Sequence, residues 1–197
     1  MNKYPYKFTP TEYDLDDLIK KRWSPVAFSA QPIEMEKINS LFEAMRWAPS
    51  SRNEQPWRIV YATRDNEQEF NVLADLLDEG NSYAKDAFLL LVICGLRHHN
   101  YHHKPNRTYQ YDTGAGAQNL FLQAVSLDLV AHEMGGFDIK RSYEVLGIPK
   151  EEVEVIAMIA VGHPGDESKL SPQFQAKQSE PRNRQPISDF VFKGRWR

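Results

Sequence analysis

The residues best suited to chemistry in this chain gather between Ala48 and Trp57, in the order Ala-Pro-Ser-Ser-Arg-Asn-Glu-Gln-Pro-Trp. Pro49 and Pro56 fix their own φ angles and push the residues before them towards extended conformations. The hydroxyl and amide side chains between the two prolines can donate and accept hydrogen bonds. A stiff loop with short polar side chains suits a flat ligand rich in heteroatoms. An ordinary turn rich in Ser, Asn and Pro has the same composition, so the loop alone leaves both interpretations open.

Regular elements flank this loop on both sides. A helical pattern with one apolar stripe runs from about Glu34 to Trp47, and a strand-like run follows from Trp57 to Thr63. A first helix precedes them and ends near Ser24-Pro25. From Gly162 onwards the chain is polar and lacks clear periodicity until Pro186. Further helices are predicted at about 65–77, 112–127 and 139–146, and further strands at 88–95, 129–132 and 155–161.

The order of the elements indicates the fold class. The first two predicted elements are both helices, and no glycine-rich turn of the dinucleotide-binding type follows the first strand. This argues against a Rossmann fold and favours an α+β arrangement of helices around one sheet, in a single domain over residues 1–197. The continuous apolar run at 88–95 predicts a strand covered on both faces. A glycine-stopped helix end is expected at Gly80-Asn81.

Composition excludes several classes of partner. The chain has 197 residues, of which 41% are hydrophobic and 26% charged, and its net charge of -3 gives no reason to expect nucleic acid or an anionic membrane. One cysteine, Cys94, excludes an intrachain disulfide and fits a reducing compartment. The N-terminus lacks an apolar core like that of a signal peptide, and the longest apolar run, 87–94, is too short to span a bilayer. We therefore expect a cytoplasmic protein with no membrane contact.

The loop Ala-Pro-Ser-Ser-x-Asn-x-Gln-Pro-Trp resembles the signature loop of the nitroreductase family, FMN-dependent oxidoreductases that work as intertwined homodimers. The resemblance implies a nitroreductase-like α+β fold, with a central mixed or antiparallel sheet flanked by helices. It also implies that the loop reaches the flavin bound mainly by the other subunit. The predicted helix at 112–127, with small residues such as Gly114 and Ala117, would lie at the dimer interface. The tail, residues 163–197, would wrap the partner subunit.

Four further segments resemble motifs of the same family, in the same order. Arg22-Trp23-Ser24 resembles its Arg-x-Ser-x-(Arg/Lys)-x-Phe motif, and a guanidinium with a hydroxyl suits the flavin's phosphate and ribityl chain. The second cation of that motif falls on Val26, and valine cannot replace it. Gly80-Asn81, the segment 132–138 and Arg182-x-Arg184-x-Pro186 resemble the other three. The resemblance assigns the cofactor to Arg22, Trp23, Ser24, Pro49, Ser50, Ser51, Asn53, Asn81, Glu133, Met134, Gly135, Gly136, Arg182 and Arg184.

Structural roles stay open for several of these residues. Asn81 could be a helix-stop residue, Asp138 could cap the next helix, and the two tail arginines could be solvated. The histidines at 98, 99, 102 and 103 favour a mobile loop on the substrate side over a metal site, because no carboxylate or cysteine lies close in sequence.

The resemblance implies an enzyme in which FMN accepts a hydride from NADH or NADPH at N5 and passes electrons to a small acceptor. Nitroaromatics, quinones and free flavins are the acceptors it suggests. The flavin carries the chemistry, so no catalytic acid or base is assigned. Two alternatives remain at this stage: a flavin-binding or storage protein without turnover, and an oxygen-dependent enzyme of the same fold that consumes flavin or dehalogenates a substrate.

Overall fold

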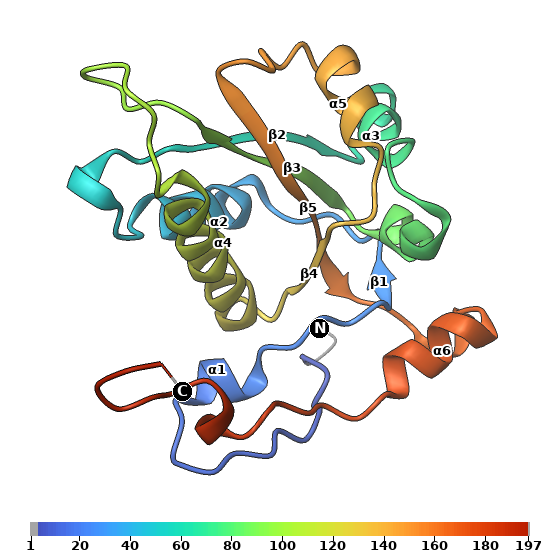
Figure 1. The fold of residues 1–197 in the computed structure, drawn as a ribbon. Helices are drawn as coiled ribbons and strands as arrows, with labels where there is room; N and C mark the ends of the chain where they lie inside the picture. Colours follow the sequence, from blue (N-terminus) through green and yellow to red (C-terminus); the bar gives the residue numbers. More distant parts are fainter. Residues whose placement is uncertain (1–3, 197) are drawn as a thin grey trace.

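The computed structural model describes residues 4–196, and at its centre lies an antiparallel sheet of five strands (Figure 1). Along the sheet the order is β1-β5-β3-β2, and β4 also pairs with β5. The strand bounds are Phe28–Ser29 for β1, Trp57–Thr63 for β2, Leu89–Leu96 for β3, Val130–Met134 for β4 and Val153–Pro164 for β5. The sheet is therefore antiparallel rather than mixed, which agrees with the α+β expectation.

Strands β3 and β5 form the buried middle of this sheet. Seven of the eight residues of β3 are buried, and alternate side chains face opposite sides. Leu89, Leu91 and Ile93 belong to one hydrophobic cluster, while Leu90 and Val92 belong to the other. The prediction of a strand covered on both faces is confirmed.

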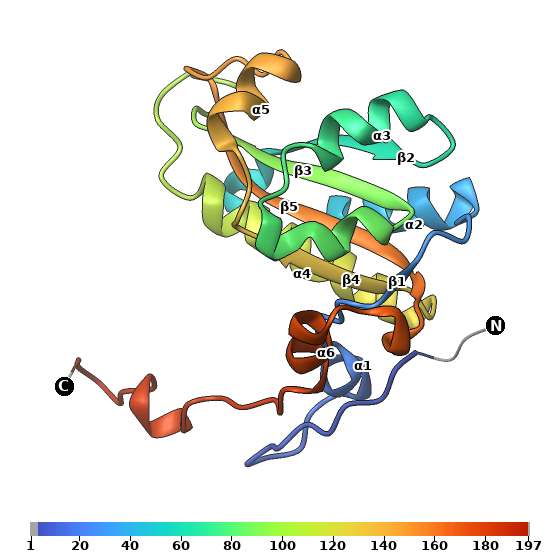
Figure 2. The ribbon, with the colours of Figure 1, turned by 90° about the vertical axis from the view of Figure 1, so that its right-hand side faces the viewer.

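Helices cover the two faces of the sheet (Figure 2). Helices α2 (Met35–Arg46) and α4 (Tyr109–Ser126) pack against each other over the cluster that contains Leu89. Helices α3 (Glu67–Ala74) and α5 (Ile139–Val145) lie over the opposite face. Asp138 caps α5, because its carboxylate accepts a hydrogen bond from the Arg141 N–H at 2.9 Å. Each face of the sheet is thus closed by a pair of helices.

The N-terminal segment with α1 and the C-terminal segment with α6 lie on the same side of the molecule, outside these layers (Figures 1 and 2). Helix α1 (Asp17–Lys21) has no buried residue, and α6 (Pro172–Ser179) leads into the extended tail. Arg182 of the tail donates a hydrogen bond to the Lys20 carbonyl at 2.7 Å. The tail is therefore fixed to the end of α1 rather than to the sheet.

Some sequence-based expectations were wrong. The stretch after Gly162 contains the helix α6. Its apolar pattern is too weak to indicate a helix, and the one local signal is Pro172 in the first turn, where helices often begin. Strand β1 was not expected, because two residues carry no periodicity. Gly80 and Asn81 do not stop a helix: α3 ends at Ala74, and both lie in a 3₁₀ segment, Glu79–Asp86.

Two glycines of α4 have different surroundings. Gly116, rather than Gly114, meets the neighbouring helix: a Cβ atom on Gly116 would lie 2.9 Å from the Met45 Cγ atom of α2. Gly114 is exposed, with open space around it. The close approach of α2 and α4 therefore requires a glycine at 116, and Gly114 is free for another contact.

Within residues 4–196, none of the helices combines the length and the apolar character that crossing a bilayer requires.

Candidate functional site

The loop between α2 and β2 is held in an unusual backbone conformation. Arg52, Asn53 and Gln55 have φ angles of 54°, 58° and 48°, although none is glycine. Each such residue costs roughly 1–2 kcal/mol, so surrounding bonds must hold the loop in place. The Ser50 hydroxyl accepts a hydrogen bond from the Gln55 N–H at 3.0 Å, and the Ser51 N–H donates to the Asp112 carboxylate at 3.1 Å. The loop is thus pre-shaped, as a ligand-binding loop requires.

A buried carboxylate ties this loop to the histidine-rich segment 97–107. One oxygen of Glu54 accepts a hydrogen bond from the Asn100 N–H at 2.9 Å, and its other oxygen lies 3.3 Å from the His99 Nδ1 atom. The Asn100 amide also donates to the Glu54 carbonyl, at 2.9 Å. Arg52 hydrogen-bonds the hydroxyl of Tyr101. The 97–107 segment, expected to be a mobile loop, is therefore held firmly at its first half.

Glu54 was missed by the sequence reasoning. The only signal was an acid inside a loop whose other side chains are mostly uncharged. The hydrogen bond from the Asn100 N–H is the main reason that the pKa of Glu54 lies below its ordinary value, and His99 adds to the effect. Across the described residues no group of three or more potential ligands could hold a metal ion.

Asn81 and the Gly135-Gly136 turn, predicted separately, are brought together. The Asn81 amide donates a hydrogen bond to the Gly136 carbonyl at 2.8 Å. A Cβ atom on Gly136 would lie only 2.7 Å from the Asn81 Nδ2 atom, so the contact requires glycine. Gly135 has open space where a Cβ would be. Glu133 is exposed and Met134 is buried at the end of β4. A ligand can therefore approach the backbone of this turn closely.

Two further residues connect this turn to the segment before β1. The Tyr83 hydroxyl lies 3.0 Å from the His132 Nε2 atom and 3.2 Å from the Asn81 Oδ1 atom. The His132 Nδ1 atom lies 3.0 Å from the Pro25 carbonyl oxygen. Three of the five predicted motifs thus meet in one hydrogen-bonded chain. Tyr83 was not selected from the sequence, and His132 entered only as the first residue of the segment 132–138, without a role of its own.

Three arginines gather at the other end of this segment. Arg22, Arg182 and Arg184 line one cavity of 210 Å³ together with Thr9. The Arg22 guanidinium lies 3.4 Å from the Ser24 hydroxyl, and Arg182 donates to the Arg22 carbonyl at 2.9 Å. Arg184 is exposed and donates only to the neighbouring carbonyl.

These arginines have no acidic partner. Among residues 4–196, none of the three forms an ion pair with a carboxylate. Burial lowers the pKa of Arg22 and of Arg182, and the mutual repulsion of the cations acts in the same direction. Arginine nevertheless stays charged in proteins. Three cations that share a small cavity without acidic partners form a site that an anion such as a phosphate would stabilise.

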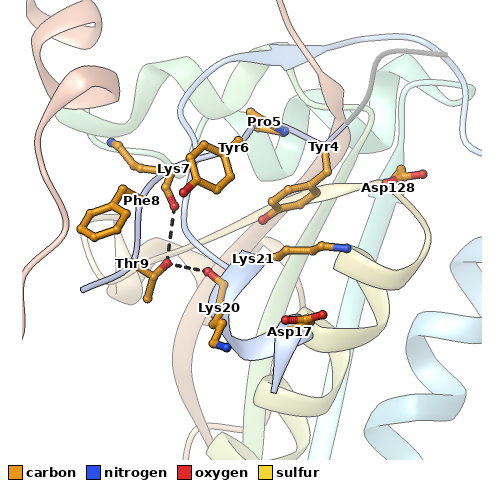
Figure 3. A pocket seen from close by; sticks show the side chains of 10 residues that line it. All are labelled: Tyr4, Pro5, Tyr6, Lys7, Phe8, Thr9, Asp17, Lys20, Lys21 and Asp128. Atoms are coloured by element: carbon orange, nitrogen blue, oxygen red, sulfur yellow. Dashed lines mark hydrogen bonds between the residues drawn. The ribbon is translucent and has the colours of Figure 1, made fainter. Parts of the chain in front are cut away.

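Thr9 joins this cavity to a larger one beside it. Figure 3 shows the 560 Å³ pocket lined by the chain near Tyr4–Thr9, where the Thr9 hydroxyl donates to the Lys20 carbonyl at 2.7 Å. The same hydroxyl also contacts Arg182. The N-terminal segment, α1 and the tail therefore build the arginine cavity together.

Trp23 and Val26 face the interior rather than this cavity. The Trp23 indole is buried and donates to the Pro5 carbonyl at 2.9 Å, so a ligand would meet the backbone of Trp23 and not its ring. Val26 is buried, and its N–H donates to the Gln178 side chain of α6 at 2.8 Å. Helix α6 therefore covers the place where a second cation was missing.

The Ser50–Asn53 loop lies apart from the other motifs. Within the described part of the chain, its hydrogen bonds go to α4 and to the 97–107 segment. Figure 1 shows it at the end of the sheet away from α6. Within a single polypeptide, Arg22–Phe28 therefore lies beside Asn81 and the turn after β4, and Arg182 and Arg184 lie beside Arg22. The Ser50–Asn53 loop is separate from both groups.

Comparisons with known proteins give a consistent result. The model of the Nitroreductase family matches residues 19–92 and 77–163. A crystal structure of an oxidoreductase containing FMN superimposes with a TM-score of 0.89 at 38% identity, covering 95% of this chain and 96% of that one. An uncharacterized 15.4 kDa protein of Mycolicibacterium smegmatis is 36% identical over 133 residues, 66% of this chain and 86% of the relative. A protein of Archaeoglobus fulgidus, provisionally named an NADH dehydrogenase/NAD(P)H nitroreductase, is 27% identical over 76% of this chain and 85% of its own length.

The buried Glu54 gives a prediction about pH. Because its folded pKa lies below the unfolded value, its contribution to stability is fully present above the unfolded pKa of about 4.3 and is lost as pH falls through the folded value. Glu54→Gln should therefore lower the free energy of unfolding near neutral pH, and the difference from wild type should shrink as the pH falls below about 4. Urea unfolding across this range measures it. The exposed Glu151→Gln is the matched control; an equal effect of both variants at every pH would contradict the anchoring role.

Proposed function

The chain belongs to the nitroreductase family, and we propose that it is an FMN-dependent oxidoreductase that transfers a hydride from NADH or NADPH to a small acceptor. The acceptors we propose are nitroaromatics, quinones or free flavins. FMN, when bound, supplies the hydride-accepting atom N5, and the chain binds and orients the cofactor. The coenzyme proposal is supported by the name of the Archaeoglobus fulgidus relative, and the cofactor by the FMN of the structural relative.

The arginine cavity is the observation that carries this proposal. Arg22, Arg182 and Arg184 line it without an acidic partner in residues 4–196, and Ser24 adds a hydroxyl beside Arg22. A terminal phosphate monoester matches these donors in charge and geometry. FMN ends in such a group, whereas the phosphates of FAD are bridged to a nucleoside. We therefore assign the phosphate of FMN to this cavity.

The turn after β4 fits the flavin ring. The open space at Gly135 lets a flat ring approach the backbone, while glycine at 136 makes room for the Asn81 amide, which holds the Gly136 carbonyl in place. We expect a backbone N–H group of this turn to donate to the polar edge of the ring. The strand β4 pairs with the buried β5, which holds Glu133 opposite Ile159 and Met134 opposite Met158.

We further propose that two chains share each site in a homodimer. The Ser50–Asn53 loop is rigid and polar, yet it is separate from the other motifs of its own chain, so we assign it to the flavin of the partner subunit. Apolar side chains at both chain ends support this proposal: Ile19 of α1 is 40% exposed and Phe190 of the tail is 58% exposed. A partner subunit would cover them. The buried Cys94 accords with the cytoplasmic location that we propose.

A flavin-binding protein without turnover is the second candidate. Val26 stands where the family motif has a cation, and it is buried under α6 with its N–H bonded to Gln178. Without that charge the reduced ring loses one source of stabilisation. The two functions differ in whether a nicotinamide coenzyme reduces the bound flavin.

The phosphate assignment predicts that the protein purifies yellow with FMN. Arg182→Ala with Arg184→Ala should weaken FMN binding by at least about a hundredfold, because each charge-assisted bond contributes about 1.5–3 kcal/mol. Arg182 also holds α1, so Arg184→Ala alone is the cleaner variant; it should weaken binding roughly tenfold or more with the fold intact. Fluorescence titration with FMN measures both. The exposed Arg107→Ala is the control, and unchanged affinity in the double variant would place the phosphate elsewhere.

Anaerobic mixing with NADH and NADPH in turn tests the enzymatic proposal. In an oxidoreductase, at least one coenzyme should bleach the visible absorbance of the oxidised flavin. Addition of a quinone or nitroaromatic should then restore the colour. Flavin that stays oxidised with both coenzymes, in protein that binds FMN tightly, would instead indicate the storage function.

The shared site predicts that dilution affects assembly, flavin binding and folding together. Because an obligate dimer has no stable folded monomer, sedimentation should show flavin loss in step with dissociation. The measurement is sedimentation velocity detected at both the protein and the flavin absorbance over a range of concentrations. A folded monomer that still carries FMN would rule out the shared site.

A further inference from the structure

A chain of hydrogen bonds runs from the segment before β1 to the glycine turn. It begins at the Pro25 carbonyl and passes through His132, Tyr83 and Asn81 to the Gly136 carbonyl, over distances of 3.0, 3.0, 3.2 and 2.8 Å. Tyr83 is 2% exposed, so water does not reach this point freely. Asn81 and His132 are half-buried, and the Tyr83 hydroxyl also accepts a hydrogen bond from the Lys177 ammonium at 3.5 Å. The buried hydroxyl therefore depends on these protein groups for its partners.

Both ends of this hydrogen-bond chain are backbone carbonyl oxygens, which only accept hydrogen bonds. A carbonyl accepts only, so the Pro25 end requires a proton on His132 Nδ1. The Gly136 carbonyl requires the amide nitrogen of Asn81, which turns the amide oxygen towards Tyr83. That oxygen in turn requires the hydroxyl proton of Tyr83. Burial raises the pKa of Tyr83, so its hydroxyl keeps its single proton.

When His132 is neutral, the hydrogen-bond chain has one proton fewer than it needs to supply a donor for every contact. If Nδ1 carries the proton, Nε2 is an acceptor and competes with Asn81 for the one proton of Tyr83. If Nε2 carries it, the bare Nδ1 faces the Pro25 carbonyl at 3.0 Å. Either tautomer leaves two lone pairs opposed, at the buried Tyr83 hydroxyl or between half-buried His132 and the Pro25 carbonyl, which is unfavourable. With both nitrogens protonated, every bond from Pro25 to Gly136 has one donor and one acceptor.

In the protein without FMN, the environment of His132 opposes protonation of its second ring nitrogen. Burial is the main reason that the pKa of His132 falls to about 4, and the cations Lys177 of α6 and Arg22 act in the same direction. Lys177 lies against Tyr83, with its Nζ atom 4.7 Å from the ring centroid. Arg22 is also one of the three arginines of the cavity. An anion held there would offset the charge of Arg22 and favour protonation of His132.

We propose that His132, Tyr83 and Asn81 form a proton-linked positioning device: His132 takes up a proton from solvent as FMN binds, and the completed hydrogen-bond chain fixes the Gly136 carbonyl. His132 is a positioning residue here, since it acts through Tyr83. The inference rests on the proposed flavin site. It couples the phosphate end of that site to the ring end through groups of the chain itself.

The direction of the pH effect follows from linkage. If bound FMN raises the pKa of His132 above about 4, binding between the free and the bound pKa takes up as much as about one proton per FMN. Above the bound pKa the uptake disappears, and below about pH 4 both states are already protonated. The FMN phosphate itself titrates near about pH 6, so the contribution of His132 must be measured as a difference between variants.

Calorimetric titration of FMN into apoprotein tests the proposal, in buffers of different ionisation enthalpy near about pH 5.5, where the linkage operates. Wild type should take up more protons per FMN than His132→Gln, and Tyr83→Phe should lose most of the same excess while keeping its ring contacts. His98→Gln, an exposed histidine in the 97–107 segment, should behave as wild type. Equal uptake in wild type and His132→Gln, or full uptake in Tyr83→Phe, would overturn the proposal.

A second measurement does not depend on folded variants. The imidazole ¹⁵N shifts of His132 in wild-type protein should report a neutral ring without FMN and an imidazolium with FMN at the same pH. A ring that is neutral in both states would overturn the proposal. Apoprotein that binds no FMN at any pH would remove the proposed function as well, whereas tight binding without proton uptake would remove this inference alone.

Discussion

The long buried strand β5 is the constraint on which the rest of the fold depends. It pairs with β3 along most of its length and also with β4 and β1. Glycines make the last pairing possible: a Cβ on Gly162 would lie 3.1 Å from the Phe28 ring, and one on Gly165 would lie 2.2 Å from the Phe28 carbonyl oxygen. Because β1 follows Arg22–Ser24 and β4 precedes the Gly135-Gly136 turn, one strand sets the distance between two parts of the candidate site.

Electrostatics divide the site into two ends. At one end, three arginines share a cavity with each other and with hydroxyl groups, and their positive charge is not balanced by carboxylates in residues 4–196. At the other end, the Asn81–Gly136 contact is neutral and made by backbone and amide groups. His132 lies between them, and the positive charge of Arg22 lowers the pKa of its imidazole. A ligand with a phosphate and a flat polar ring matches this order, and the proposed FMN site joins the two ends on that ground.

The Ser50–Asn53 loop shows how strain is supported. Left-handed backbone at Arg52, Asn53 and Gln55 would relax if the loop were free. Asp112 at the start of α4 and Glu54 with its partner Asn100 hold it from two sides. The histidine-rich segment therefore has a structural role as a brace, in addition to any contact with a substrate. The four histidines did not indicate this role, because the glutamate that contacts His99 and Asn100 lies 45 positions before His99.

The sequence by itself determined the fold class, the order of the motifs and, to within a few residues at each end, the helices α2 and α4 and the strands β2 and β3. Those features are local: apolar periods of two or 3.6 residues and loops punctuated by proline. Only the tertiary structure decided that Asn81 meets Gly136, that Tyr83 and His132 join them, and that Gly116 rather than Gly114 faces α2. Such contacts depend on register and crossing geometry between segments far apart in the chain. Helix α6 escaped prediction for a related reason: its side chains carry little apolar pattern, and its place is set by Gln178 bonding to Val26 152 residues earlier.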